Sequence, residues 1–280
     1  MFTTRFAPSP TGQLHLGHAY SALLAYDMAQ AASGRFLLRI EDTDTGRCTP
    51  AFEAQIYDDL AWLGLTWETP VLRQSNNTAA YDAAITHLGN LGLLYPCSCT
   101  RSDIRSAASA PQEGAPMHGP DGLIYPGTCR NRSWEDRKDS DAVRLNIARA
   151  LDQLTTLPAY TETGIHPALR LTRAHFIEGV GDVVLARRDT KTAAYHLSVV
   201  VDDAAQGITH VIRGEDLATA TPIHVLLQAL LGCETPIYLH HRLIRDEDGK
   251  RLAKRDDARA IALYRREGAS PQDIRRMVGL

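Results

Sequence analysis

One stretch near the start of the chain decides the fold, and it reads Arg5-Phe6-Ala7-Pro8-Ser9-Pro10-Thr11-Gly12-Gln13-Leu14-His15-Leu16-Gly17-His18. Residues 2–7 predict a strand, and residues 17–33 carry apolar side chains at helical spacing. Residues 36–40 form a compact apolar run that is typical of a buried parallel strand. A strand, a helix and a second strand in this order predict a βαβ unit, and therefore an α/β fold with a parallel sheet.

The turn between the first strand and the first helix is a candidate phosphate site. Open α/β sheets bind nucleotides at the carboxyl ends of their strands, and a helix N-terminus offers free N–H groups to an anion. Gly12 and Gly17 let the backbone approach a ligand closely. His15 and His18 are three residues apart and can donate hydrogen bonds to the same phosphate. Taken alone, the two histidines could equally be surface or helix-capping residues.

The later chain shows the same alternation of elements. Thr49-Pro50 and Thr221-Pro222 predict an N-cap followed by proline in the first helical turn. Ser270-Pro271 predicts the start of a final helix. Further helices are predicted over residues 78–91 and 194–201, strands over residues 143–147, 182–185, 208–212 and 237–239, and a Pro/Gly-rich loop over residues 109–128.

The segment from Arg5 to His18 resembles the first signature of the glutamyl-tRNA synthetases, which are class I aminoacyl-tRNA synthetases. The resemblance implies a Rossmann-like parallel sheet, an inserted zinc-containing connective subdomain and a short helical C-terminal segment. It also implies that His15 and His18 are catalytic, and that Gly12, His15, Gly17 and His18 bind ATP. Mg²⁺ is expected on the ATP phosphates.

A second signature of this family lies late in the catalytic core and carries a lysine that neutralises the departing pyrophosphate. Residues 251–255, Arg-Leu-Ala-Lys-Arg, resemble it, with Lys254 as the catalytic and ATP-binding charge. The segment departs from the common Lys-Met-Ser-Lys-Ser form at Arg251 and Ala253. Taken alone, a basic turn of this kind is a solvated surface feature.

Several separated residues match the amino-acid pocket of the family. The resemblance gives Glu41, which follows the second strand, the substrate α-amino group. Two arginines suit a substrate with two carboxylates, which favours glutamate over glutamine, although the pairing of each arginine stays open. The expected glutamate-binding residues are Arg5, Phe6, Ala7, Pro8, Ser9, Glu41, Tyr195 and Arg213. Structural roles are expected for Asp42, Asp44, Asp202 and Asp203.

Three cysteines bracket the Pro/Gly-rich loop and predict a structural zinc site. Cys97, Cys99 and Cys129 supply three thiolates, and tetrahedral zinc needs one more ligand. His118 is the chemically usual candidate, whereas the resemblance indicates Tyr125. One zinc per chain would stabilise a segment with little core of its own. The alternative is three buried or free thiols.

The resemblance covers nearly the whole chain and predicts four parts. Residues 1–95 and 166–240 form two halves of the catalytic domain, residues 96–165 an inserted zinc and acceptor-binding subdomain, and residues 241–280 the second-signature loop with a C-terminal helical segment. Only about 25 residues follow Arg255, too few for the large anticodon-reading domain of glutamyl-tRNA synthetases. This favours the glutamyl-Q tRNA(Asp) synthetase branch, in which glutamate is activated without tRNA and transferred to queuosine.

The partners expected from this branch are L-glutamate, ATP and tRNA(Asp) bearing queuosine. A truncated enzyme charging the 3′ end of tRNA(Glu), a nucleotidyltransferase with a small acceptor, and a non-catalytic paralogue that binds glutamate or RNA are the alternatives. The nucleotidyltransferase does not explain Arg5, Glu41, Tyr195 and Arg213 together.

Composition limits the remaining choices. There are 30 Lys and Arg against 33 Asp and Glu, a formal net charge of −3, so no overall basic field attracts nucleic acid. The start of the chain lacks a signal-peptide pattern, and no apolar run is long enough to cross a membrane. We therefore expect a cytoplasmic monomer without a membrane partner. Five cysteines, an odd number, argue against a disulfide framework.

Overall fold

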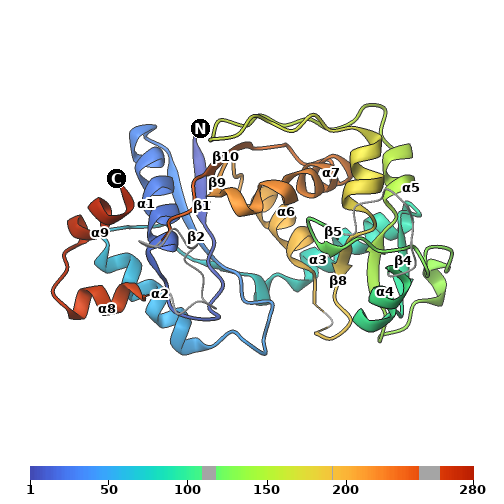
Figure 1. The fold of residues 1–280 in the computed structure, drawn as a ribbon, viewed down its shortest axis with the longest axis horizontal. Coiled ribbons are helices and arrows are strands. Elements are labelled where there is room, and N and C mark those ends of the chain that lie inside the picture. The colour runs from blue at the N-terminus through green and yellow to red at the C-terminus, as the bar shows by residue number, and fades with distance from the viewer. Residues whose placement is uncertain (109–117, 191, 246–258) are drawn as a thin grey trace.

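The computed structural model describes residues 1–108, 118–190, 192–245 and 259–280. Its first βαβ unit consists of β1 (Thr3–Phe6), α1 (Leu16–Ala31) and β2 (Arg35–Ile40), and β1 and β2 pair in parallel. The short strand β3 (Leu72–Arg73) extends this sheet in parallel beyond β2. The helix α1 connects the two strands and packs against them, and Figure 1 shows it alongside β1 and β2.

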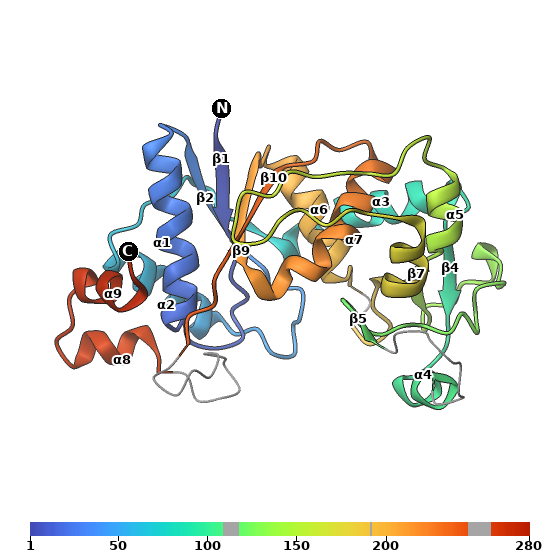
Figure 2. The ribbon, with the colours of Figure 1, turned by 45° about the horizontal axis from the view of Figure 1, so that its top comes forward.

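A second parallel pair continues the nucleotide-binding half. It consists of β9 (His210–Gly214) and β10 (Ile237–His241), which are connected by α7 (Thr221–Leu231). The backbone N–H of Thr209 donates to Thr3 at 3.0 Å, so β9 lies beside β1, and Figure 2 shows the four strands together. Strand order therefore reverses between β1 and β9, the place where open α/β sheets bind ligands.

An antiparallel sheet forms the other end of the molecule (Figure 1). It has the order β4-β7-β8, with β4 at Leu94–Cys97, β7 at Ala142–Leu145 and β8 at Val184–Ala186. The helix α6 (Tyr195–Ala205) lies between the two sheets and packs on α7 and α3. The remaining elements are α2 (Pro50–Trp62), α3 (Thr78–Asn90), α4 (Arg101–Ala108), β5 (His118–Gly119), β6 (Gly122–Leu123), α5 (Ile147–Asp152), a π-helix η3 (His175–Val180), and 3₁₀ turns η1 (Gln74–Asn76), η2 (Trp134–Asp136) and η4 (Glu215–Ala220).

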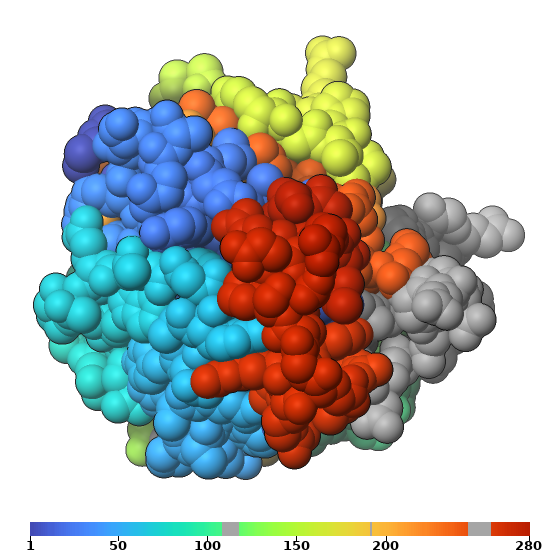
Figure 3. Space-filling model, turned by 90° about the vertical axis from the view of Figure 1, so that its left-hand side faces the viewer, coloured from blue at the N-terminus to red at the C-terminus, as the bar shows by residue number. Residues whose placement is uncertain are grey.

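The last two helices, α8 (Ile261–Arg266) and α9 (Pro271–Val278), fold back on the first βαβ unit. Ile261, Ile274 and Val278 are fully buried in the same core as α1. Arg275 of α9 pairs with Asp27 of α1 at 2.7 Å. Figure 3 shows these helices covering the surface of α1 and α2. The C-terminal segment is therefore part of the nucleotide-binding half, and not an appended tail.

Local patterns predicted most of these elements correctly. Thr49 is the N-cap of α2 and accepts from the N–H of Phe52, and Ser270 forms a capping box with Asp273. The prediction that Thr221 caps α7 is wrong: Ala220 is the N-cap because the preceding 3₁₀ turn runs directly into the helix, and Thr221 is its first residue. The short hairpin β5–β6 lies where only a loop was expected. The four-part domain division stays a prediction.

One buried carboxylate, that of Asp59, is opposed by burial and only distantly balanced by Arg265. Asp59 on α2 is fully buried, and neither oxygen has a hydrogen-bond partner in the described part of the chain. Burial, reinforced by the neighbouring Asp58, raises the pKa of Asp59 to about 6. Because the folded protein holds the Asp59 proton more tightly than the unfolded chain does, stability falls as the pH rises through this value.

We predict that Asp59→Asn raises the free energy of unfolding at pH 8 by about 1–3 kcal/mol, since it removes a poorly balanced buried charge. The gain should shrink at pH 5, where the Asp59 carboxyl is protonated in the folded protein. Thermal unfolding of both proteins at the two pH values measures the difference. Equal gains at both pH values, or a loss at pH 8, would contradict a charged Asp59.

Candidate active site and metal site

A cleft of about 520 Å³ opens at the carboxyl ends of β1, β2 and β9. Its lining includes nearly all the predicted pocket residues, namely Arg5, Phe6, Ala7, Pro8, Ser9, His15, Gly17, His18, Glu41, Tyr195 and Arg213. Gly12 is not among the lining residues. Lys254 lies outside the described residues. Most of the residues that we predicted to bind ATP and glutamate therefore line the same cavity.

The two signature histidines cap α1. The ring of His15 accepts from the N–H of Gly17 at 3.1 Å, and the ring of His18 accepts from the N–H of His15 at 3.2 Å, both through Nδ1. An Nδ1 that accepts a backbone N–H places the proton of a neutral ring on Nε2. A Cβ on residue 17 would meet the His15 ring at 3.0 Å, which explains the glycine there. Each ring therefore carries its N–H on the nitrogen remote from the backbone that it caps.

Asp203, the last but two residue of α6, bridges two arginines from neighbouring strands. Arg5 of β1 donates Nε and Nη2 to the two Asp203 oxygens at 2.9 and 3.2 Å. Arg39 of β2 donates Nη1 to Asp203 Oδ1 at 2.6 Å, and its side chain is completely buried. Burial works against ionisation, but Arg5 and Arg39 together lower the pKa of Asp203. The carboxylate stays charged and fixes both arginines.

Glu41 lies beside the Arg39–Asp203 ion pair, and one of its two carboxylate oxygens already accepts a hydrogen bond. Its Oε1 accepts from Arg39 Nη2 at 3.1 Å, whereas Oε2 has no hydrogen-bond partner among the described residues. Burial raises the pKa of Glu41, while Arg39 and Arg5 oppose the rise. An ammonium group brought into the cleft would stabilise the ionised form of Glu41.

Arg213 at the end of β9 faces the cleft from the other side. Its Nε donates to His240 Nε2 at 3.1 Å, and its Nη1 contacts His224 Nδ1 at 3.1 Å. Its Nη2 donates to the carbonyl oxygen of Leu217 and to Thr221 Oγ1. None of these partners is a carboxylate. The buried Arg213 guanidinium therefore lacks a directly bound counter-charge within the described residues.

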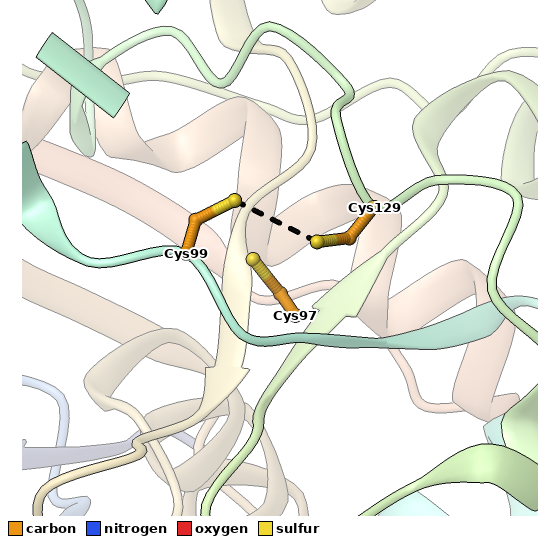
Figure 4. A group of neighbouring side chains, drawn as sticks. All are labelled: Cys97, Cys99 and Cys129. Carbon is orange, nitrogen blue, oxygen red and sulfur yellow. Dashed lines mark hydrogen bonds between the residues drawn. The ribbon is translucent and has the colours of Figure 1, made fainter. Parts of the chain in front are cut away.

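The three cysteines predicted to bind zinc lie together at the antiparallel sheet, and Figure 4 shows their sulfurs converging. Cys99 Sγ lies 3.6 Å from Cys129 Sγ, and the phenol oxygen of Tyr125 lies 3.4 Å from Cys97 Sγ and 3.3 Å from Cys99 Sγ. Tetrahedral zinc with the usual bond lengths separates two thiolates by about 3.8 Å and a thiolate from an oxygen by about 3.5 Å. The four groups fit that ion.

The surroundings of Tyr125 favour its participation over that of His118. The backbone N–H of Cys129 donates to the Tyr125 oxygen at 2.8 Å, and the Arg144 guanidinium lies 3.9 Å from the centre of its ring. Burial, with the three thiols, raises the pKa of Tyr125, so a bound cation is needed to ionise the phenol. His118 is exposed on β5 and is not part of the cluster. Zinc itself stays a prediction.

Comparisons with known proteins agree with this geometry. Residues 1–280 match the family described as tRNA synthetases class I (E and Q), catalytic domain. The chain is 58% identical to the glutamyl-Q tRNA(Asp) synthetase of Rhodobacter capsulatus over 99% of both chains, and 44% identical to that of Nocardia farcinica over 96% of this chain and 81% of the relative. The chain belongs to the glutamyl-Q tRNA(Asp) synthetase family.

Solved structures give the same fold. A glutamate tRNA ligase from Elizabethkingia meningosepticum, in complex with its amino acid, superimposes with a TM-score of 0.78 at 27% identity. The glutamate-tRNA synthetase of Elizabethkingia anophelis gives 0.78 at 26%. The chain is covered completely and spans 60% and 61% of those chains. The class I α/β fold with a parallel sheet is thus confirmed.

Family membership makes the chain a ligase of the aminoacyl-tRNA-synthetase type, for which ATP and Mg²⁺ are implied. No helix of the described ranges combines the length and apolar character needed to cross a membrane.

Several residues of this family member's cleft were not predicted from sequence. Ser21, Asp216, Leu217 and His241 line the cavity, and Ser21 Oγ lies 2.7 Å from His241 Nε2. His224 and His240, which contact Arg213, were not predicted either. Asp203 was expected to be structural, and its position supports that: it holds Arg5 and Arg39 without lining the cavity. No local sequence pattern marks these residues, which come together only in the folded chain.

Removing the Asp203 charge should destabilise the folded protein. We predict that Asp203→Asn lowers the free energy of unfolding by about 3 kcal/mol, because it leaves two buried guanidinium groups without their shared carboxylate. Chemical denaturation measures the change. Asp44→Asn is the matched control: its pair with Arg47 is solvent-exposed, so the loss should stay under about 1 kcal/mol. If both variants lost the same free energy of unfolding, the buried ion pairs of Asp203 would contribute no more to stability than an exposed pair.

The zinc prediction is tested by metal content. Freshly purified protein should contain about one zinc per chain by elemental analysis, and Cys97→Ala should lose it because three ligands hold zinc poorly. Cys233→Ala is the control, since Cys233 lies outside the cluster and its thiol donates to the Leu231 carbonyl oxygen at 3.9 Å. Absence of zinc from the wild-type protein, or its retention in Cys97→Ala, would refute the site.

Proposed function

We propose that this protein activates L-glutamate with ATP in the cleft, without tRNA, and transfers the glutamyl group to queuosine in the anticodon loop of tRNA(Asp). The observation that carries the proposal is the joint lining of one cavity by Arg5, Glu41, Tyr195 and Arg213 beside the capped start of α1. The name glutamyl-Q tRNA(Asp) synthetase, carried by relatives that match nearly the full chain, supports the choice of acceptor.

Two arginines suit the two carboxylates of glutamate. Asp203 occupies the Nε and Nη2 groups of Arg5, which leaves the Nη1 end of the guanidinium for a ligand. Arg213 brings a second cation whose direct partners are uncharged. Bidentate and charge-assisted hydrogen bonds of this kind are strong, and an amide in place of a carboxylate forfeits the charge. The cleft therefore favours glutamate over glutamine.

Glu41 and Tyr195 complete the proposed amino-acid site. Glu41 offers its second oxygen to the α-ammonium group, next to the Arg39 contact that fixes the carboxylate. Tyr195 is the first residue of α6, and burial raises the pKa of its phenol, which stays a hydrogen-bond donor. Together with Phe6, Ala7, Pro8 and Ser9 of the β1 turn, these groups surround a small zwitterion.

The phosphate end of the cleft lies at α1. The Nε2–H groups of His15 and His18 would donate to the α-phosphate oxygens, beside the positive end of the helix. Gly12 and Gly17 keep their predicted backbone roles, and Lys254, with Mg²⁺, would balance the charge of pyrophosphate. A glutamate carboxylate oxygen then attacks the α-phosphorus, the bond to the β-phosphate oxygen breaks, and glutamyl-adenylate and pyrophosphate form.

In the second step, a hydroxyl of the queuosine cyclopentene ring attacks the adenylate carbonyl carbon. The ester bond forms, AMP leaves, and the hydroxyl proton is released. Zinc at Cys97, Cys99, Tyr125 and Cys129 has a structural part in this proposal, in holding the inserted subdomain that we place at residues 96–165. Activation and transfer both depend on orientation by the cleft, which can supply a large share of the rate.

The test combines labelled glutamate and ATP with no tRNA, with queuosine-containing tRNA(Asp) or with tRNA(Glu). We predict glutamate-dependent pyrophosphate exchange without tRNA, and label transferred only to queuosine-containing tRNA(Asp). Label on tRNA(Glu) and none on tRNA(Asp) would identify an enzyme for the 3′ end. No exchange under any condition would indicate a non-catalytic paralogue, and either result would overturn the proposal.

Glu41→Gln should raise the KM for glutamate about tenfold or more while changing the KM for ATP little, since an amide cannot balance the ammonium charge. Glu68→Gln makes the same substitution at an exposed ion pair with Arg35 outside the cleft, and should leave both constants unchanged. Pyrophosphate exchange at varied glutamate and ATP gives both values. If the two substitutions changed the KM for glutamate equally, Glu41 would not be a glutamate-binding residue.

A further inference from the structure

Arg213 is held by an unusual set of neighbours. Four of the five N–H donors of its guanidinium have partners: Nε with His240, one on Nη1 with His224, and both on Nη2 with Leu217 and Thr221. The fifth, on Nη1, has no partner among the described residues. The side chain is buried and lines the cleft. Arg213 is therefore fixed almost completely by the protein, with one donor left for a ligand.

The contacts of Arg213 decide the protonation of both histidines. A guanidinium only donates, so His224 Nδ1 and His240 Nε2 must both be unprotonated acceptors. The remaining proton of His224 lies on Nε2 and is donated to His196 Nδ1 at 3.0 Å, and His196 in turn reaches Asp121 at 3.3 Å through Nε2. The remaining proton of His240 lies on Nδ1 and is donated to Glu162. Each ring has one tautomer that satisfies all its contacts.

Electrostatics keeps the two rings neutral. Burial, reinforced by Arg213, lowers the pKa of His224 well below its usual value, and the same two causes lower the pKa of His240 although Glu162 opposes them. The carboxylates of this network, Asp121 and Glu162, reach Arg213 only through intervening histidines. Arg5 differs, because Asp203 binds it directly. Arg213 therefore keeps a positive charge that no bound carboxylate of the described residues balances, and a substrate carboxylate can balance it.

We propose that His224 and His240 are positioning residues that hold the Arg213 guanidinium as neutral acceptors, so that its uncompensated charge selects an acidic amino acid over its amide. The inference rests on the proposed function, because it takes glutamate as the occupant of the cleft. The two histidines act through Arg213 and neither lines the cavity. A carboxylate in place of either ring would pair with Arg213 and remove the charge that the substrate needs.

An isosteric pair of substitutions separates charge from shape. His224→Asn places an amide oxygen near the position of Nδ1, so Arg213 keeps a neutral acceptor. His224→Asp has the same shape and adds a negative charge. We predict that Asn leaves the KM for glutamate within about threefold of wild type, and that Asp raises it about ten- to a hundredfold with little change in the KM for ATP. The preference for glutamate over glutamine should fall by a similar factor in His224→Asp.

A second pair tests the other ring. His240→Gln keeps an acceptor near the position of Nε2, and His240→Leu removes it. The expected order of glutamate affinity is wild type, then Gln, then Leu, measured by tRNA-independent pyrophosphate exchange and by direct glutamate binding in calorimetry. Ser198→Ala is the control: within the described residues, this fully buried hydroxyl on α6 bonds to the backbone carbonyls of Ala194 and Tyr195 in the first turn of the helix.

The readouts keep a structural role and the proposed function apart. If His224→Asp and His224→Asn lose thermal stability and kcat equally, with the same KM for glutamate, the histidines are merely structural and the inference is overturned. If wild-type protein binds and activates glutamate, but His224→Asp and His240→Leu have the same KM for glutamate as wild type, the inference fails and the proposed function stands. If wild-type protein neither binds nor activates glutamate, the proposed function fails first.

Discussion

The structure depends on one carboxylate, that of Asp203, which joins elements far apart in the sequence. From α6 it binds Arg5 on β1 and Arg39 on β2, 198 and 164 residues away along the chain. All three side chains are buried, so removal of the Asp203 carboxylate leaves Arg5 without the carboxylate that it binds, where water cannot screen the charge. The adjacent Asp202 is held by hydrogen bonds from the neutral side chains of Gln74, Asn77 and Tyr81. The position of α6 against the parallel sheet, and with it the wall of the cleft, follows from these contacts.

The cleft combines two differently balanced cations. Asp203 compensates Arg5 before any ligand arrives, whereas Arg213 is surrounded by neutral acceptors. Such an arrangement costs folding free energy, because a buried charge without a direct counter-ion is unfavourable. It is useful in a binding site, since a ligand carboxylate recovers that energy and an uncharged analogue does not. The cleft then selects an acidic amino acid because the protein itself provides no carboxylate to pair with Arg213 among the described residues.

Local chemistry made much of the fold predictable from the sequence. The turn from β1 into α1, the proline-marked starts of α2 and α9 and the apolar strands depend on residues close in the chain, and the structure confirms them. The three cysteines could also be grouped from their spacing and family resemblance. Long-range pairing could not be predicted. The β4-β7-β8 sheet, the bridge from Asp203 to Arg5, and the histidines around Arg213 join residues that no local pattern relates.

The central claim is that one cavity unites a phosphate end at α1 with an acid-selective end at Arg5 and Arg213. The most direct measurement is calorimetric titration with stable sulfamoyl analogues of glutamyl-adenylate and glutaminyl-adenylate, which fill both ends at once. The account predicts that the glutamyl analogue binds at one site per chain and that the glutaminyl analogue binds about tenfold more weakly or worse. Equal binding of the two, or no binding of the glutamyl analogue, would contradict it.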